Sequence, residues 1–242
     1  FDNDGDMDVL VGNRIRPKHF PVSASSQLLQ NDNGVFTDVT AKVAPGLSDF
    51  GIINSLLITD FDSDGDSDIM AVGEWSHIGM FENKQGHFED VSASYGVDTQ
   101  KGWWFTISET DLNKDGYPDY VVGNIGDNVK YKASQKKPFK VFANDFDDNG
   151  TWDLVLSSQY NGNYVPARGK ECSTQQMPFI SDKFKTYNEF ANATLSDIYG
   201  DKLTDAYQKE VTTFSSMLLL NNGNGGFEIT ALPAMAQTAP IL

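Results

Sequence analysis

Short apolar runs, each bounded by polar and turn-forming residues, recur along the chain. Four of them cover residues 9–11, 69–72, 120–122 and 154–156, and three of the four are followed directly by glycine. Runs of this length, rich in Val, Ile and Leu, are typical of buried β-strands rather than helices. The pattern therefore predicts a chain that is mostly β-sheet.

A second recurring pattern predicts β-hairpins. Residues 27–40, 79–92 and 218–230 each read as a strand, an Asn/Gly turn and a second strand. Phe36 and Phe88 occupy the same place in the first two hairpins and are 52 positions apart. A period of about 40–50 residues with several strands in each unit is typical of the blades of a β-propeller.

An acidic loop of nine residues precedes each apolar run and shares the hairpin period. Complete copies occupy residues 60–68, 111–119 and 145–153, and a copy cut by the chain start occupies residues 2–8. Oxygen-bearing side chains at loop positions 1, 3, 5 and 9, glycine at position 6 and the carbonyl of position 7 can surround a hard cation. The sequence thus predicts Ca²⁺ in three complete loops and one truncated loop. The predicted ligating positions are Asp2, Asp4, Asp6, Asp8, Asp60, Asp62, Asp64, Asp66, Asp68, Asp111, Asn113, Asp115, Tyr117, Asp119, Asp145, Asp147, Asn149, Thr151 and Asp153.

These loops are not EF-hands. An EF-hand needs a bidentate Glu at position 12 and a helix on each side. Position 12 is Ala71, Val122 or Leu156 in the complete copies, and the flanking segments are predicted strands. Each loop is therefore predicted to join two strands of one sheet.

The combined pattern resembles a known repeat family. The loop D-h-D-x-D-G-x-x-D, the apolar strand and the hairpin N-x-x-G-x-F-x-D-V-T are similar to the FG-GAP/VCBS repeats of integrin α-subunits and bacterial surface proteins. Residues 11–14, 73–75, 102–104 and 122–124 resemble the bacterial branch related to cartilage acidic protein (ASPIC/UnbV). The resemblance implies an all-β fold, a partial β-propeller with about four blades visible in residues 1–242, and calcium in the inter-strand loops. The resemblance does not imply a particular function, because propellers serve many functions.

Two segments depart from this pattern. No N-x-x-G-x-F hairpin follows Asp119 directly, and the next acidic loop begins 34 residues after Asp111, which predicts a blade that is shortened or fed by an irregular loop. Residues 160–212 are predicted to form a helical insertion of two or three short helices within a blade. Their apolar residues recur at helical spacing, and Thr194 followed by Asp197 resembles a capping box.

Composition narrows the possible partners and the location. Lys and Arg number 18 against 34 Asp and Glu, a net charge of −16, which disfavours nucleic acid as a partner. No apolar run approaches the length needed to insert in a membrane. Because the chain begins inside a repeat, the rest of a longer chain is expected. Loops of this kind need more calcium than the cytosol holds, so an extracellular, cell-surface or periplasmic location is predicted.

Known catalytic motifs are not found in the sequence, and no catalytic residue is predicted. The favoured function is recognition of a protein or carbohydrate ligand, with calcium in a structural role. A propeller-type polysaccharide lyase or hydrolase and a structural spacer of a large surface protein remain alternatives. Trp75, Trp103 and Trp104 are candidates for sugar stacking or for core packing. A basic patch fits either an anionic ligand or a solvated loop; it comprises Lys130, Lys132, Lys136, Lys137 and Lys140.

Overall fold

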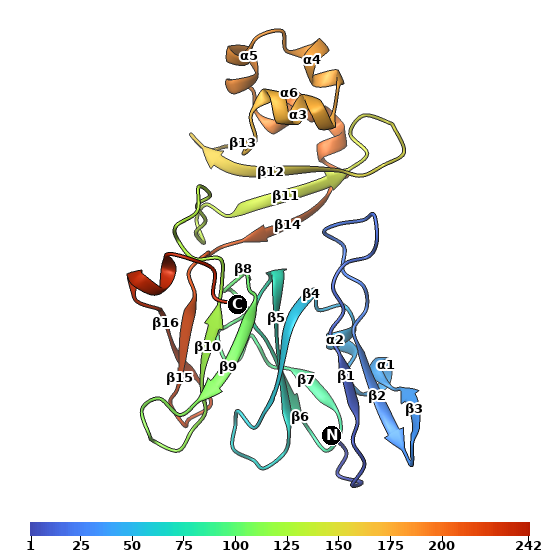
Figure 1. Ribbon diagram of the computed structural model, residues 1–242, viewed down its shortest axis with the longest axis vertical. Helices are drawn as coiled ribbons and strands as arrows, with labels where there is room; N and C mark the ends of the chain where they lie inside the picture. Colours follow the sequence, from blue (N-terminus) through green and yellow to red (C-terminus); the bar gives the residue numbers. More distant parts are fainter. The chain divides into compact units, whose positions relative to one another are not determined.

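A computed structural model describes residues 1–242, which form two compact units (Figure 1). The first unit comprises Phe1–Ile15, Val22–Val129 and Phe214–Leu242. The second, called the inserted unit below, comprises Arg16–Pro21 and Lys130–Thr213.

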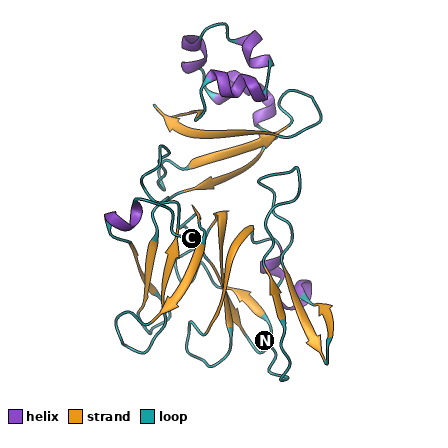
Figure 2. Cartoon of the chain, in the orientation of Figure 1, coloured by secondary structure: helices purple, strands orange, loops and turns teal.

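The first unit contains three antiparallel sheets; all strands of the chain are drawn in orange in Figure 2. The first sheet has the order β1(Val9–Val11), β2(Gln27–Asp32), β3(Val35–Asp38). The second has the order β4(Ile52–Thr59), β5(Asp68–Ser76), β6(Gly79–Asn83), β7(Phe88–Asp90), with β8(Gly102–Trp103) paired to β5. The third has the order β9(Thr106–Thr110), β10(Asp119–Gly123), β15(Met217–Asn221), β16(Phe227–Ala231). Strands that follow one another in each sheet are antiparallel neighbours, as in propeller blades, and the all-β, propeller-like fold class is confirmed.

Strand β5 is apolar at consecutive positions, with no alternation of apolar and polar residues, because both of its faces are buried. Ile69 and Ala71 belong to a buried cluster with residues of the first sheet, whereas Met70 and Val72 belong to a cluster with residues of the third sheet. Successive side chains of a strand point to opposite faces, so β5 is buried on both of its faces. The second sheet is thus packed between the other two sheets of its unit. Trp104 is fully buried in the cluster shared with the third sheet, which confirms core packing for this residue.

The third sheet corrects the prediction of a shortened blade after Asp119. Strand β10 pairs with β15 in the register Tyr120↔Leu219 and Val122↔Met217. The hairpin of β15 and β16 therefore completes the blade that begins with the loop at 111–119, and residues 130–213 are inserted between two neighbouring strands. Such an insertion is tolerated because its ends already lie side by side and loop-closure entropy grows slowly with length.

Hydrogen bonds close the neck of the insertion within the first unit. The N–H of Gly126 donates to the carbonyl of Phe214 at 2.8 Å. Gln237, at the end of the short helix η2(Ala234–Gln237), is only 5% exposed. Its side chain accepts from the N–H of Ser216 at 2.8 Å and donates to the carbonyl of Ser216 at 2.9 Å. Its own carbonyl accepts from the N–H of Asp127 at 2.9 Å, so the two chain segments of the neck are held together.

The inserted unit is a fourth antiparallel sheet covered by short helices (Figure 1). The strand order is β13(Asn163–Pro166), β12(Asp153–Tyr160), β11(Phe139–Asn144), β14(Tyr207–Val211). The helices are α3(Lys170–Gln176), α4(Phe179–Lys183), α5(Tyr187–Ala191), α6(Leu195–Tyr199) and η1(Gly200–Leu203). Met177, Ile180 and Ile198 pack with Phe142 and Val155 of the sheet in one buried cluster.

Capping residues delimit two of these helices. Thr194 caps α6, accepting from the N–H of Asp197 while the Asp197 side chain accepts from the N–H of Thr194, and the predicted capping box is confirmed. Thr186 and Glu189 form a second capping box at α5. The two remaining helices, α1(Thr40–Val43) and α2(Pro45–Ser48), follow β3. No helix of the chain is long and apolar enough to cross a membrane.

One asparagine in each of two hairpins of the first unit links neighbouring blades. Asn221 donates from Nδ2 to the buried carbonyl of Phe61, in the acidic loop of the second sheet, at 2.9 Å. Asn83 donates from Nδ2 to the carbonyl of Phe1, the equivalent loop position of the first sheet, at 3.1 Å. Each asparagine therefore ties the turn of its own blade to the loop of the blade before it.

Replacing Asn221 with alanine is expected to lower the free energy of unfolding by about 1–3 kcal/mol, because the buried Phe61 carbonyl loses its donor. Asn224→Ala is the matched control, since Asn224 is exposed and its side chain bonds only within the turn. Its expected effect is below about 0.5 kcal/mol. Urea unfolding of both variants measures the difference, and equal losses would contradict a role for Asn221 between blades.

Candidate metal-binding loops

The four acidic loops share one backbone shape. Loop positions are counted from 1 at Asp60 and at the equivalent residue of the other loops. The glycine at position 6 is left-handed in all four, with φ of 84° to 96° in Gly5, Gly65, Gly116 and Gly150. The residue at position 4 is also left-handed, with φ of 60° to 65° in Asn3, Ser63, Lys114 and Asp148. Glycine adopts this conformation without a Cβ penalty, which explains the glycine at position 6. The left-handed position 4 is not apparent from the sequence, because serine and lysine do not favour that conformation.

The carboxylate at position 1 organises each complete loop. In the loop at 60–68, Asp60 accepts from the N–H of Asp64 and of Gly65, both at 3.1 Å. Asp111 accepts from positions 5 and 6 of its loop at 3.2 and 3.1 Å, and Asp145 does so at 2.9 and 2.8 Å. These bonds curl the loop around the carboxylate at position 1.

The residue at position 5 makes a further turn in every copy. Its side-chain oxygen accepts from the N–H of position 7, two residues on, at 2.8 to 2.9 Å in Asp4, Asp64, Asp115 and Asn149. This is the Asx-turn geometry favoured by Asp and Asn. The side-chain oxygen of position 5 is thereby held against the backbone of its own loop.

Carboxylates converge in two loops, one in each unit. Oxygens of Asp60, Asp62 and Asp64 lie within 4.8 Å of one another, and the same holds for Asp145, Asp147 and Asp153. Burial, followed by the charge of Asp64, raises the pKa of Asp62. Three like charges this close repel one another, and a cation between them removes that repulsion.

Asp147 gives a direct test of whether these residues fit a metal ion. Its Oδ1 atom is buried and accepts no hydrogen bond, although buried carboxylate oxygens are almost always satisfied. A cation held by Asp145, Asp147 and Asp153 would satisfy this atom. The donor set of the loop therefore fits a hard metal ion.

The other two loops hold fewer converging carboxylates. Asn113 replaces the acid at position 3 of the loop at 111–119, and its Nδ2 donates to Asp115 at 2.8 Å. In the truncated loop, Asp2 accepts from the Gln30 side chain at 2.6 Å, and Asp4 occupies position 5. Two of the four loops thus have clustered carboxylates, and the other two have fewer carboxylates close together.

Side chains at position 7 lie outside both carboxylate groups. Asp6 accepts from the N–H of Asn33 at 2.7 Å, and Asp66 is contacted by Asn3 at 3.5 Å. The hydroxyl of Thr151 donates to Asn149. Tyr117 lies against Gly223, where a Cβ atom would come within 2.5 Å of its ring. This arrangement agrees with a predicted ligand role for the carbonyl of position 7 and not for its side chain.

The aspartate at position 9 has a second role that sequence reasoning missed. Asp119 is fully buried, and its two oxygens accept from the N–H of Leu112 at 2.8 Å and of Asn221 at 2.9 Å. Asp68 makes the equivalent bonds to Phe61 at 3.1 Å and Asn83 at 2.8 Å. The carboxylate therefore joins the start of the loop to the next hairpin of its blade. The recurring hairpin asparagine, at a constant place in each repeat, is the sequence signal that marks its partner.

Burial raises the pKa of two position-9 carboxylates, Asp68 and Asp153. Desolvation raises the pKa of Asp68 to about 7, with smaller contributions from the charges of Asp62 and Asp64, while the two N–H donors act in the opposite direction. Burial likewise raises the pKa of Asp153, which Gln176 of α3 opposes by donating at 3.2 Å. Asp8 keeps the bond to its hairpin, accepting from the N–H of Asn31 at 2.9 Å.

A lysine completes the loop of the inserted unit. The Lys202 Nζ, from η1, lies 2.6 Å from a carboxylate oxygen of Asp148. It also donates to the carbonyls of Asp145 at 3.2 Å and Phe146 at 3.1 Å. Nothing in the local sequence of the loop indicates this contact, because Lys202 reaches it through the tertiary fold.

The fold and the loops define a propeller-type repeat protein with acidic loops suited to a metal ion. The family model for the FG-GAP-like repeat matches residues 1–71 and 60–122, which together span half of the chain. The chain belongs to the FG-GAP-like repeat family. A comparison with curated proteins gave no match.

Position 9 and position 5 of one loop are expected to respond differently to removal of charge. Asp119→Asn places an NH₂ group against a backbone N–H, so the free energy of unfolding should fall by about 1–3 kcal/mol. This loss is expected even in EDTA. Asp115→Asn keeps an oxygen for the N–H of Tyr117 on an exposed side chain, and in EDTA it should change stability by less than about 0.5 kcal/mol. Urea unfolding in EDTA compares the two, and a neutral Asp119→Asn would refute the strand-joining role.

Proposed function

We propose that this chain is a calcium-stabilised propeller module that recognises a protein or glycan outside the cytoplasm. The observation that carries the calcium assignment is the convergence of carboxylates in two loops, including the buried Oδ1 of Asp147 with no hydrogen-bond partner. All predicted ligands are oxygens, and neither His nor Cys takes part. Oxygen-only sets on flexible loops favour Ca²⁺ over transition metals.

Calcium has a structural role in this proposal. Asp60, Asp62 and Asp64 would hold one ion in the first unit, and Asp145, Asp147 and Asp153 would hold another in the inserted unit. The ion supplies positive charge that neutralises the clustered acids. Because the unfolded chain does not preserve the site, the free energy of ion binding adds to the free energy of folding.

The location follows from the affinity expected of such loops. The carboxylates are partly satisfied by backbone N–H groups of their own loop, and one oxygen ligand is an amide in the loops at 111–119 and 145–153. Both features weaken ion binding relative to a high-affinity site. Calcium modules outside the cytosol work with dissociation constants of about 10⁻⁴–10⁻³ M. An extracellular, cell-surface or periplasmic location is therefore proposed.

Recognition is favoured over a purely structural function by the inserted unit. Its strands and helices have a buried cluster of their own, and no strand of this unit pairs into the three sheets of the first unit. The three sheets of the first unit are complete without it. A separate unit inserted between two consecutive strands of one blade is suited to presenting a binding surface.

Calcium is expected to stabilise the chain by an amount that rises with the logarithm of its free concentration above the dissociation constant. At a free Ca²⁺ concentration about 100 times the dissociation constant, one site adds roughly 2.7 kcal/mol to the free energy of unfolding. Thermal unfolding across a Ca²⁺ titration measures this effect, with EDTA as the reference and Mg²⁺ as the control ion. A melting temperature that is the same in EDTA and in Ca²⁺ would rule out structural calcium sites.

The loop at 60–68 allows a test of individual ligands. Asp64→Ala removes a clustered carboxylate, whereas Asp66→Ala removes a position-7 side chain and leaves the backbone carbonyl in place. The calcium-dependent rise in melting temperature should be reduced for Asp64→Ala and retained for Asp66→Ala. The difference between Ca²⁺ and EDTA is measured for each variant, so that any general loss of stability cancels. Equal reductions in both variants would contradict the ligand assignment.

A further inference from the structure

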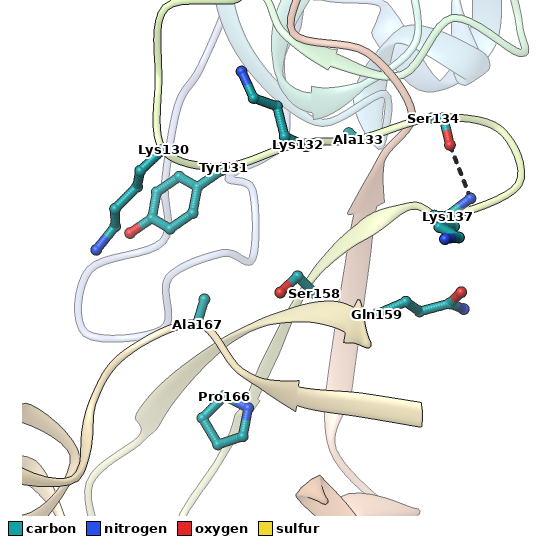
Figure 3. A pocket seen from close by; sticks show the side chains of 10 residues that line it. All are labelled: Lys130, Tyr131, Lys132, Ala133, Ser134, Lys137, Ser158, Gln159, Pro166 and Ala167. Atoms are coloured by element: carbon teal, nitrogen blue, oxygen red, sulfur yellow. Dashed lines mark hydrogen bonds between the residues drawn. The ribbon is translucent and has the colours of Figure 1, made fainter. Parts of the chain in front are cut away.

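A cavity of about 420 Å³ lies in the inserted unit, outside the metal-binding loops. One wall is the segment at 130–137, and the other is formed by the ends of β12 and β13 (Figure 3). All ten lining residues belong to the inserted unit. The volume is within the range of about 300–1,000 Å³ that is typical of sites for small ligands.

The cavity is positively charged in a strongly acidic protein. Lys130, Lys132 and Lys137 line it, and no Asp or Glu is among the lining residues. Across the chain, acids outnumber bases by 34 to 18. Neither Lys130 nor Lys137 forms an ion pair, so their charges are not neutralised by the protein. Lys130 and Lys137, both exposed, thus give the cavity a positive charge that an anionic ligand would complement.

The uncharged part of the lining suits a sugar ring. Ser134 and Ser158 offer hydroxyl groups, and Gln159 offers an amide, as Figure 3 shows. These groups both donate and accept hydrogen bonds, as sugar hydroxyls require. Pro166 and Ala167 add apolar surface for the C–H faces of a ring.

Tyr131 and the turn that follows it are held in place by the protein. The ring of Tyr131 stacks on fully buried Phe139 with centroids 4.6 Å apart, and the Lys130 Nζ lies 5.0 Å from the centroid of the Tyr131 ring. The N–H of Ser134 donates to the carbonyl of Lys137 at 3.0 Å, and the N–H of Lys137 donates back at 3.1 Å. A wall fixed in this way loses little conformational entropy when a ligand binds.

We propose that this cavity binds a negatively charged oligosaccharide. The lysines would pair with its carboxylate or sulfate groups, and the hydroxyl, amide and ring groups would contact the sugar. The inference rests on the proposed recognition function and names its ligand class and its site. The hydroxyl and amide groups of Ser134, Ser158 and Gln159 match the many hydroxyls of a sugar, and an acidic peptide of equal charge is the competing outcome of the test below.

The test is isothermal titration calorimetry of the full chain, with the same dialysed Ca²⁺ buffer in cell and syringe. The probes are hexagalacturonate, a sulfated carrageenan hexasaccharide, neutral maltohexaose and hexaglutamate. At least one of the two anionic saccharides should bind, with affinity that falls as salt rises, while maltohexaose and hexaglutamate should bind at least about tenfold more weakly. Comparison of the two anionic saccharides distinguishes carboxylate from sulfate as the source of charge.

Charge-reversal variants locate the site. Lys130→Glu with Lys137→Glu should weaken binding by at least about tenfold, since two attractive contacts become repulsive. Lys136→Glu is the matched control, because Lys136 neighbours Lys137, is exposed and does not line the cavity. It should weaken binding by less than about threefold. The melting temperature of each variant is measured in the same samples to show that it is folded.

Each other outcome overturns the proposal. No binding of either anionic saccharide, or equal binding of maltohexaose or hexaglutamate, would exclude a site specific for acidic sugars. Equal affinity in the double variant and the wild type would place the ligand elsewhere. These failures are distinct from failure of the calcium proposal, because the latter is read from the melting temperature in Ca²⁺ and EDTA, without any saccharide.

Discussion

The buried carboxylate at position 9 of each acidic loop is the interaction on which the first unit depends. Asp68 and Asp119 are the first residues of the central strands β5 and β10. The carboxylate of each accepts hydrogen bonds from a backbone N–H at the start of its loop and from a backbone N–H of the next hairpin. The asparagine that donates one of these bonds also reaches the loop of the preceding blade. One carboxylate and one amide thus connect loop, strand, turn and neighbouring blade. Replacing either one leaves buried polar groups without partners, a larger loss than that of one exposed hydrogen bond.

A metal ion held in the loops would add to this arrangement and would not replace it. The backbone bonds to positions 1 and 5 shape the loops through protein atoms alone. What the protein does not supply is compensation for the clustered charge, as the raised pKa of Asp62 and the unpartnered oxygen of Asp147 indicate. The loop is therefore organised by protein atoms, and the binding free energy of an ion held there would add to the free energy of folding.

Local sequence patterns predicted the parts of the fold that depend on local interactions. The apolar runs, the hairpins around Asn83 and Asn221 and the capping box at Thr194 were all expected, because each is determined by a few adjacent residues. The partner of β10 was not, since β15 follows it only after the inserted unit. An apparently missing hairpin was thus a displaced one. Sequence separation hides such a pairing, although the hairpin itself was recognisable.

The same reasoning explains which features of the site were missed. The acids of the loops were identified by their spacing, but their convergence into only two groups depends on Asn113 in one loop and on the loss of position 1 in another. Lys202 and Gln176 reach the loop at 145–153 from helices that lie far along the chain. Position 4 carries no common residue type, so no residue marks its left-handed backbone in the sequence, and this backbone is present even in the loop at 2–8, which lacks position 1.

The loop of the inserted unit shows that the acidic motif works without the hairpin that accompanies it elsewhere. Asp153 retains its bond to the N–H of Phe146, but its second oxygen accepts from Gln176 of α3 instead of a hairpin asparagine. Lys202, just after α6, contacts the opposite side of the same loop. An ion held by Asp145, Asp147 and Asp153 would therefore be connected to the helices through both side chains. In this unit the loop joins a sheet to its helical cover, whereas in the first unit it joins one blade strand to the next.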